Sequence, residues 1–582
     1  MPTVNVIKRD LESLLNMSIS DNTINEKFPM MGIEVEDIYE EVKSNNKNEK
    51  IIQFSVNPDR PDYLSVEGIA RGFRGFMGID MGMPKYHAQD SHVEFFVEEV
   101  KNRPYCAFAI VKNIPMNDYL LESIINLQEK LHWTIGRDRK KVAIGIHDLD
   151  KVTPPFYYKE VSGEEIKFEP LGWDKEATPK EILNKHEKGI KYAHLIPNDR
   201  YPIILDKNGN VLSMPPIING NLTKITNETK NILIDITGWE IQAIENTLNI
   251  LVCALADRGG KIYSVKLNKL NSKENNVMDN GKGDSTIKDN PIQNTVVYPN
   301  LTPETHEVSV DYINKRLGLN LNPGEIIGAL RRARMDGDYN YEKNSIIVQV
   351  PPYRVDILHE VDFTEEVAIH HGYNRFIGNF PNVSTIGEKH PLEKKLEYIR
   401  NIMIGHGFFE VINLTLSNEE VLFKKMNMEV GDREYIEVLK PASIEHRVVR
   451  SWILPLLLET LYINKHNELP QSIFEVGDAV IIDNPGKSLA VCKNITKLAF
   501  VITHPSANFN EVKSYGESIL WELDINYRLE NYNHPSFIPG RCAKIINLRN
   551  NKIIGYFGEI HPEVILNFQL EHPVVGFEME IE

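Results

Sequence analysis

The sequence has few cysteines and none of the short motifs that bind zinc or nucleotides unaided. Its 582 residues include four cysteines, at positions 106, 253, 492 and 542, and no two of them have C-x-x-C spacing. H-E-x-x-H, G-x-x-x-x-G-K-S/T and a G-x-G-x-x-G that follows a strand are also absent. These absences argue against a disulfide framework, a zinc site and autonomous nucleotide chemistry, and they favour a reducing compartment.

Long apolar runs are absent as well. No stretch of about twenty apolar residues occurs, and the first ten residues, MPTVNVIKRD, lack the apolar core of a signal peptide. We therefore predict a cytoplasmic protein with no membrane partner. The net charge of −17 argues against a protein that coats nucleic acid through bulk charge, although it leaves local basic patches open. A chain of 582 residues should form about three to five domains.

Five segments differ in their residue patterns. Residues 1–85 predict a compact mixed α/β module, and residues 93–267 alternate strand and helix patterns as in an α+β module. Residues 268–300 are rich in Asn, Lys, Asp and Gly and predict a linker. Two helical patterns and a strand make 301–380 winged-helix-like, and 390–582 predicts a large antiparallel sheet flanked by helices. The predicted fold class is therefore multidomain α+β.

Four acids gather within eleven residues of the stretch 350–376: Asp356, Asp362, Glu365 and Glu366. The preceding Pro351-Pro352 should keep the chain extended, and a helix beginning near Asp362 would place the two glutamates on its face. Gathered carboxylates repel one another unless a positive group lies among them, and a hard cation such as Mg²⁺ would suit them. The residues alone favour a simpler explanation, because acids in a first helical turn are stabilised by the helix dipole.

A polar hairpin between Val211 and Gly238 is the second candidate site. Its last strand, ILIDIT, alternates apolar and polar positions, so Asp235 and Thr237 should share one face. If Ser213 and Asn219 approach that face, they complete a small polar pocket. Such a pocket could bind an amino group or a phenol, and it could hold a water for ester hydrolysis.

The same hairpin is also compatible with a catalytic triad and with a purely structural turn. Ser213, His147 and Asp235 could be written as the triad, but no nucleophile-elbow sequence surrounds the serine. Side-chain hydrogen bonds that hold a strand end and a turn would use the same residues.

Two basic clusters allow similar alternatives. They are Arg331, Arg332 and Arg334, and the run GRDRKK at 136–141. Either could contact nucleic acid, but a solvated helix or loop face is the commoner meaning of such clusters.

Taken together, these stretches resemble the phenylalanyl-tRNA synthetase β-subunit family, in its archaeal and eukaryotic cytosolic form. The resemblance covers nearly the whole chain in the family's order. It rests on VNPDRPDYLSVEGIARG, RPYCAFAIVKNI, LQEKLHWTIGRDRKKVAIGIHDLD, LSMPPIINGNLTKITNETKNILIDITG, PPYRVDILHEVDFTEEVAIHHGYN, FIPGRCAKI and GYFGEIHPEV.

The resemblance implies a role for each region. The family's β subunit pairs with a catalytic α subunit as an (αβ)2 heterotetramer that uses ATP to attach phenylalanine to tRNA(Phe). The region 93–267 is similar to the family's editing domain, which hydrolyses tyrosine wrongly esterified to the tRNA. The implied editing residues are Ser213, Asp235 and Thr237, with Asn219, His147 and the substrate-binding Ile204 as weaker candidates. Asp235 would hold the polar end of the substrate, and the two hydroxyls would position tyrosine or water.

The resemblance also assigns Mg²⁺, shared with the α subunit, to the four acids Asp356, Asp362, Glu365 and Glu366. It further implies that 390–582 is a degenerate class II synthetase core. No G-x-G-x-x-R sequence is present there, and the terminal strand GFEMEIE has no arginine, so we expect a catalytically silent core. The alternatives are a scaffold with a decayed editing pocket and, more weakly, a metal-dependent hydrolase. The latter is disfavoured because the acids and the pocket lie in different modules.

Overall fold

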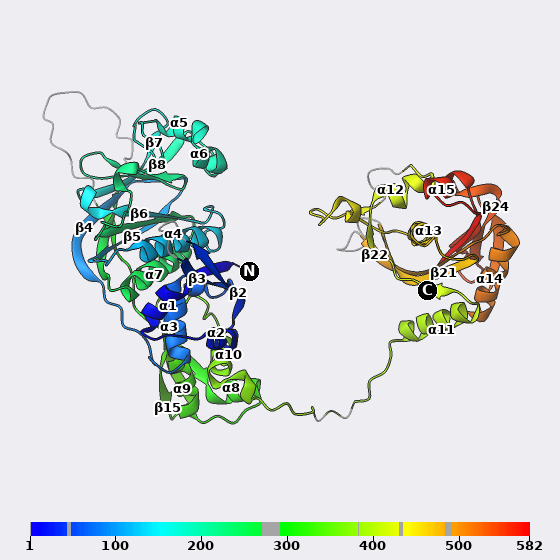
Figure 1. Cartoon of the computed structure of the whole chain (residues 1–582), viewed down its shortest axis with the longest axis horizontal. Helices are drawn as coiled ribbons and strands as arrows, with labels where there is room; N and C mark the ends of the chain where they lie inside the picture. The colour runs from blue at the N-terminus through cyan, green and yellow to red at the C-terminus, as the bar shows by residue number, and fades with distance from the viewer. Residues whose placement is uncertain are drawn as a thin grey trace. The chain divides into compact units, whose positions relative to one another are not determined.

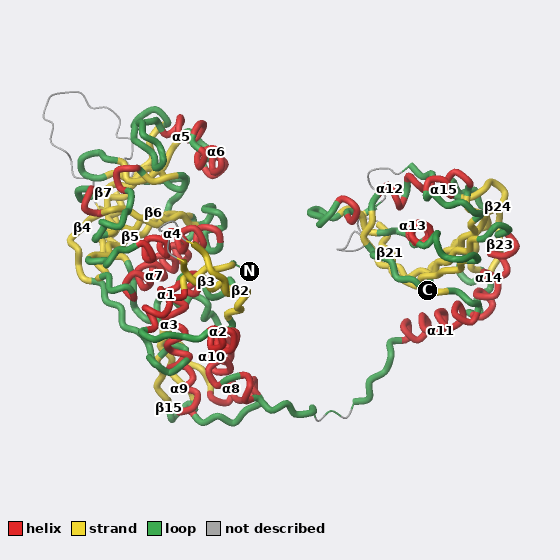
Figure 2. Tube along the Cα trace, viewed as in Figure 1, coloured by secondary structure: helices red, strands yellow, loops and turns green. Residues whose placement is uncertain are grey.

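The structure is a computed structural model that describes residues 2–42, 48–270, 292–381, 383, 385–429, 435–482 and 492–581. Two compact units, Met1–Asn379 and Phe380–Glu582, divide the chain (Figure 1). Both units contain helices and strands (Figure 2), which confirms the predicted multidomain α+β class. Within the described residues, no helix combines the length and the apolar character needed to span a membrane.

Residues 3–42 and 48–76 form a small antiparallel sheet covered by helices. The strand order is β1-β3-β2. Phe28, Phe54 and Phe73 are fully buried in this module and pack ring against ring. The main elements are β1 (Thr3–Ile7), α1 (Lys8–Leu15), α2 (Asp21–Lys27), β2 (Ile33–Val42), β3 (Asn48–Val56) and α3 (Val66–Phe76).

A ten-stranded mixed sheet follows, with the order β10-β9-β8-β7-β4-β12-β5-β11-β6 and with β13 paired to β12. Its strands are β4 (Gln89–Val97), β5 (Tyr105–Lys112), β6 (Val142–Asp148), β7 (Phe156–Ser162), β8 (Arg200–Leu205), β9 (Val211–Met214), β10 (Ile218–Asn219), β11 (Ile232–Gly238), β12 (Lys261–Leu270) and β13 (Ile292–Tyr298). Its helices are α4 (Asp118–Trp133), α5 (Pro179–Lys185), α6 (Glu187–Tyr192) and α7 (Ile241–Asp257).

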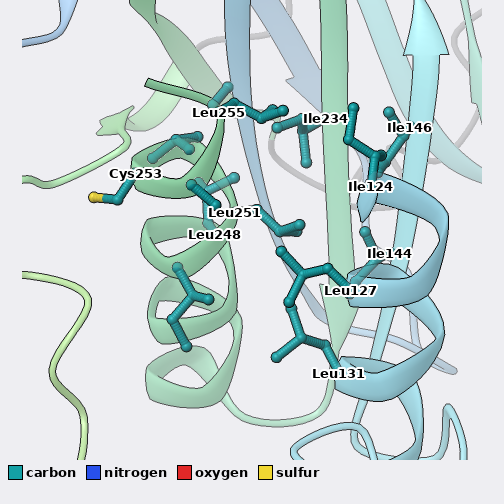
Figure 3. Close-up of a cluster of buried hydrophobic side chains, with 14 of the residues drawn as sticks. Ile124, Leu127, Leu131, Ile144, Ile146, Ile234, Leu248, Leu251, Cys253 and Leu255 are labelled. Atoms are coloured by element: carbon teal, nitrogen blue, oxygen red, sulfur yellow. The ribbon is translucent and has the colours of Figure 1, made fainter. Parts of the chain in front are cut away.

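Helices α4 and α7 cover this sheet through apolar residues at helical spacing. Leu127 of α4 and Leu248 and Leu251 of α7 are buried and meet isoleucines of β6 and β11 (Figure 3). Every residue of β11 is buried, because the strand lies between β5 and β6 with helices packed against it. The two helices and the three strands β5, β6 and β11 confirm the sequence-based prediction for this region. The neighbouring strands β5 and β6 and the two helices hold β11, the strand that carries Asp235, in place.

Residues 304–371 form a three-stranded sheet, in the order β14-β16-β15, with three helices. The predicted helices and strand are present, but the extended segment predicted for 350–357 is not a continuous strand. It turns after Val350, where Arg354 N–H donates to Pro351 C=O at 3.0 Å, because prolines cannot continue the ladder. The elements are β14 (Glu304–Ser309), α8 (Val310–Leu317), α9 (Pro323–Arg332), β15 (Asp336–Asn340), β16 (Ser345–Val350) and α10 (Glu360–His371).

The predicted linker at 268–300 falls mostly on residues 271–291, which lie outside the described residues. On either side of them the chain is in strands β12 and β13, which pair antiparallel with each other. Residues 268–270 and 292–298 therefore belong to the ten-stranded sheet.

The second unit is built on a seven-stranded sheet, in the order β17-β21-β22-β26-β25-β24-β23. All its pairings are antiparallel except β17 with β21, as predicted for a large antiparallel sheet. The strands are β17 (Phe409–Glu410), β21 (Gln471–Ile482), β22 (Cys492–Thr503), β23 (Tyr527–Asn531), β24 (Phe537–Asn547), β25 (Lys552–Ile560) and β26 (Val574–Glu580). The main helices are α11 (Pro391–Gly405), α13 (Leu454–Ile463), α14 (Phe509–Glu522) and α15 (Pro562–Asn567).

Candidate functional site

A pocket of about 200 Å³ lies beside strands β6, β9 and β11 of the ten-stranded sheet. Ser213, Asn219 and Asp235 are part of its wall, together with apolar side chains such as Ile144 and Ile217. We call it the Ser213–Asp235 pocket. Its wall combines one buried carboxylate with an apolar surface, which is a common composition for a small-molecule site.

The carboxylate of Asp235 is held from two sides. Its side chain is 2% exposed, and its Oδ2 lies 2.6 Å from Nε2 of the fully buried His147. Ser213 Oγ donates to the same oxygen at 3.3 Å. On the other side of the imidazole, Nδ1 lies 2.8 Å from Thr223 Oγ1. Both ring nitrogens of His147 therefore face oxygen atoms, and the ring fixes the position of the carboxylate.

Asp235 can occupy this position because residue 145 is a glycine. Strand β6 pairs antiparallel with β11, and Gly145 lies directly opposite Asp235. A Cβ atom at Gly145 would stand 2.0 Å from Asp235 Oδ2 and 2.7 Å from His147 Nε2. The carboxylate and the imidazole thus fill the space that a side chain at position 145 would need.

Thr237, Ile204 and His147 do not line the pocket. The hydroxyl oxygen of Thr237 accepts from Arg103 Nε at 3.1 Å, and its backbone carbonyl accepts from Arg103 Nη2 at 2.6 Å. Ile204 is fully buried and pairs with Ser213 across strands β8 and β9. The structure therefore places Ser213, Asn219 and Asp235 at the surface of the pocket, and the other three candidates behind it.

The side chains do not form the Ser-His-Asp triad that the sequence allowed. Ser213 hydrogen-bonds to the carboxylate of Asp235, whereas in a triad the histidine contacts the serine and the aspartate lies behind the histidine. Here Asp235 lies between the other two residues. That order provides no histidine base for Ser213 and suits a carboxylate that binds a ligand.

Two arginines that sequence reasoning did not assign to the site hold the pocket in place. Arg139 is buried, and its Nη1 donates to the carbonyls of Pro216 and Ile217 at 3.3 and 3.0 Å. Arg103 is also buried, and burial lowers its pKa to about 10. Arg139 belongs to the run GRDRKK, for which a solvated face was the favoured meaning. For this residue that interpretation is wrong, because its guanidinium supports the pocket wall.

The four acids of the 350–376 stretch are divided among different partners. Asp356 accepts two hydrogen bonds from Arg354, at 2.8 and 2.6 Å, and Glu366 accepts one at 2.6 Å. Arg60 lies 3.5 Å from the same oxygen of Glu366. Burial opposes ionisation of Asp356, but Arg354 and Arg60 bring its pKa below the usual value. The positive group among these carboxylates is therefore an arginine of the same chain.

The two remaining acids lie elsewhere on α10. Asp362 Oδ2 accepts from the backbone N–H groups of Leu358 and His359, both at 2.7 Å, which confirms the helix-start explanation for this residue. Glu365 is exposed and accepts from Tyr373. In the described part of the chain, no group of three or more His, Cys, Asp or Glu side chains is placed to hold a metal ion. The four acids do not fit a magnesium ion within this chain alone.

Comparison with known families covers almost the whole chain. Residues 1–78 match the Phe-tRNA synthetase beta subunit B1 domain, and residues 97–252 match the B3/4 domain. Residues 306–373 match the tRNA synthetase B5 domain, and residues 378–581 match the phenylalanyl tRNA synthetase beta chain CLM domain. The Ser213–Asp235 pocket lies in the B3/4 match, and the four acids lie in the B5 match.

Curated relatives decide the family. A phenylalanine--tRNA ligase beta subunit from Methanococcus aeolicus is 62% identical over 100% of both chains. The corresponding subunit of Methanocaldococcus jannaschii is 60% identical, again over 100% of both chains. This chain belongs to the phenylalanine--tRNA ligase beta subunit family. It is thus a subunit of an aminoacyl-tRNA synthetase, as the sequence predicts.

A solved structure supports the same family for the first unit. The crystal structure of an N-terminal fragment of the phenylalanyl-tRNA synthetase beta subunit from Pyrococcus horikoshii is 38% identical. It matches with a TM-score of 0.57 and covers 64% of this chain and 99% of the fragment. The phenylalanine--tRNA ligase beta subunit of that organism is 40% identical over 100% of this chain and 99% of its own length.

Proposed function

We propose that this chain hydrolyses tyrosine-charged tRNA(Phe) in the Ser213–Asp235 pocket, beside an α subunit that attaches phenylalanine to the tRNA. The observation that carries the proposal is the buried Asp235 carboxylate in the wall of an otherwise largely apolar pocket. The family membership supplies the class of substrate.

The pocket favours tyrosine over phenylalanine for a physical reason. A phenol hydroxyl can donate a further hydrogen bond to the Asp235 carboxylate beside those of His147 and Ser213, whereas a phenylalanine ring brings no donor to this buried charge. Water then attacks the ester carbonyl, the bond to the ribose oxygen breaks, and that oxygen takes the proton. Ser213 and Asn219 would orient the substrate or the water, since both lie in the pocket wall.

The test is deacylation of Tyr-tRNA(Phe) by the complex of this chain with its α subunit. Asp235→Asn should slow the hydrolysis roughly 100-fold, which is a typical loss for a positioned polar group. The matched control is Asp150→Asn, because Asp150 belongs to the same module but lies outside the pocket wall. Equal rates in the wild type and in Asp235→Asn would remove Asp235 from the site.

A scaffold with a decayed editing pocket is the second candidate function. One observation favours it, namely that the Thr237 hydroxyl contacts Arg103 and does not line the pocket. This candidate predicts no hydrolysis of Tyr-tRNA(Phe) by the unmutated complex. Thr237→Ala distinguishes a supporting role of Thr237 from a direct role in the reaction. A supporting role through Arg103 should alter thermal stability together with the rate of hydrolysis.

The α partner and the (αβ)2 stoichiometry are also proposals, and an exposed apolar segment after α11 supports the α partner. Phe409, Ile412 and Leu414 are 75%, 90% and 67% exposed in the isolated chain, as expected for a surface that another subunit covers. Ile412→Asp should weaken co-purification with the α subunit, and Tyr341→Asp, at an 86% exposed residue of the first unit, is the control.

The chain alone should not catalyse ATP–pyrophosphate exchange. Exchange by the pure chain would refute the assignment of aminoacylation to the α subunit.

For magnesium, we propose that Asp356, Asp362, Glu365 and Glu366 bind it only where the α subunit adds ligands. Family membership supports the need for Mg²⁺, and the contacts of Arg354 and backbone groups with three of these acids are the reason that further ligands are required. Bound Mg²⁺ would supply positive charge at the subunit boundary. Equilibrium dialysis should detect bound Mg²⁺ in the complex and none in the isolated chain. EDTA should weaken the association of the subunits. If EDTA left the subunit association unchanged and the complex held no metal, stabilisation of the helix start would be the remaining explanation for these acids.

A further inference from the structure

A second pocket in the first unit lies where α3, the end of α7 and the segment after α9 meet. Its volume is about 320 Å³, near the lower end of about 300 Å³ for small-molecule sites. Arg71, Arg74 and Arg334 line it, together with acids that include Asp80 and Asp257. We call it the Arg71–Arg334 pocket. Its wall shares no residue with the Ser213–Asp235 pocket.

The acids of this pocket already have partners. Asp257 accepts from Arg71 Nη1 at 2.5 Å and from the Tyr86 hydroxyl at 2.8 Å. Asp80 accepts from Arg74 Nε at 2.6 Å. Glu67, the third acid of the wall, accepts from Arg258 Nε at 2.7 Å. The pocket therefore does not need a cation or another donor.

The groups without partners are donors. The Arg71 side chain is 5% exposed, and its Nε and Nη2 atoms are buried without a hydrogen-bond partner. The Nε of Arg334 is buried without a partner as well. Leaving such charged donors unpaired is costly. A ligand that brings acceptor oxygens and negative charge would suit a wall whose guanidinium groups are not fully paired.

Neighbouring residues hold both arginines in place. Arg71 stacks on the Tyr353 ring, with its Cζ 3.6 Å from the ring centroid. Arg334 has a φ of +65° and lies against Gly75, where an added Cβ would come within 2.7 Å of its Cδ. The absence of a side chain at Gly75 thus leaves room for Arg334 beside α3. The two guanidinium groups reach the pocket from different elements.

We propose that the Arg71–Arg334 pocket binds a phosphate group. A planar carboxylate is satisfied by a single guanidinium fork, whereas a tetrahedral phosphate presents oxygens toward two guanidinium groups on different sides. The phosphate can come from the backbone of a bound tRNA or from free phosphate or pyrophosphate. The proposal is independent of ester hydrolysis in the Ser213–Asp235 pocket.

Calorimetric titration of the full chain with inorganic phosphate and pyrophosphate tests the proposal. Arg334→Gln should weaken binding about tenfold, and Arg334→Lys should recover part of the affinity. Arg331→Gln is the matched control, because Arg331 is exposed, carries the same charge and is not part of the pocket wall. Circular dichroism of each variant shows whether the fold is kept. No binding by the wild type, or equal binding by Arg334→Gln and Arg331→Gln, would overturn the proposal.

A second measurement, of tRNA binding, identifies the source of the phosphate. If the source is the tRNA backbone, Arg334→Gln should weaken tRNA binding more than Arg331→Gln does, and added phosphate should compete with the tRNA. If tRNA binding is unchanged while phosphate binding is lost, the ligand is free phosphate or pyrophosphate. Equal losses of tRNA affinity in both variants, with no phosphate binding, would reflect bulk charge alone and contradict the site.

Discussion

At the scale of single residues, the space around Asp235 depends on Gly145. We expect Gly145→Ala to push the carboxylate away from His147, since the new Cβ would stand 2.0 Å from Asp235 Oδ2. Hydrolysis of Tyr-tRNA(Phe) should fall at least about tenfold, and overpacking should lower the free energy of unfolding by about 1–3 kcal/mol. Deacylation assays and urea unfolding measure the two effects.

Gly328→Ala is the control for that substitution, because a Cβ at Gly328 in α9 would meet no atom within 4 Å. It should leave the hydrolysis rate unchanged. A Gly145→Ala complex that hydrolyses Tyr-tRNA(Phe) at the wild-type rate would show that the position of Asp235 does not matter for the reaction.

A histidine of the second unit should make stability depend on pH. Burial lowers the pKa of His534 from its usual 6.5 to about 4, where the ring stacks on Tyr556. The folded state then favours the neutral ring, so this stabilisation is complete above about pH 6.5 and is lost as the pH falls toward 4. The melting temperature should fall over that range.

His534→Gln should remove part of that decline in melting temperature, measured by calorimetry at several pH values. His561→Gln, at the N-cap of α15, provides the comparison because it loses the same ring from the same unit. An identical decline in the wild type and in His534→Gln would show that other groups cause it.

The residues of the candidate site were only partly predictable. Alternation along ILIDIT placed Asp235 on one face, and the structure brings Ser213 to it. Arg103 and Arg139 could not be assigned, because Thr237 and Ile217, which they hold, are distant in sequence and come near only through the tertiary fold. Arg354 is two residues from Asp356, yet the sequence-based hypothesis named only a hard cation as the positive group among the acids.

At the scale of elements, the helices could be predicted from local signals in the sequence. Helix α9 begins with a capping box, in which Asn322 Oδ1 accepts from Glu325 N–H and the Glu325 carboxylate accepts from Asn322 N–H. Asn322→Ala should lower the free energy of unfolding by about 1 kcal/mol. The measurement is urea unfolding of the chain, with the exposed Asn320→Ala as the control. Equal effects of both substitutions would exclude a role for the cap.

The order of strands in the ten-stranded sheet did not follow from local signals. Strand β12 pairs with β4, β5 and β13, although the residues that join β12 to β13 suggested a linker. Pairing between distant segments is decided by tertiary packing, which the alternation of residues within one strand does not encode. Periodicity therefore predicted which segments are strands, and the structure shows which strands are neighbours.

At the scale of the whole molecule, family membership connects the two units to one activity. The chain matches its curated relatives along 100% of its length. The Ser213–Asp235 pocket lies in the first unit, and the exposed apolar residues 409, 412 and 414 lie in the second. We infer that the pocket removes tyrosine from the tRNA, while the second unit contacts the subunit that attaches phenylalanine.

The most direct test of this account compares two substrates of the αβ complex. The rates of deacylation of Tyr-tRNA(Phe) and Phe-tRNA(Phe) should differ at least about 100-fold in favour of tyrosine, because only the phenol pairs with the Asp235 carboxylate. The preference should disappear in Asp235→Ala. Equal rates for the two substrates in the unmutated complex, or no hydrolysis of either, would contradict the account.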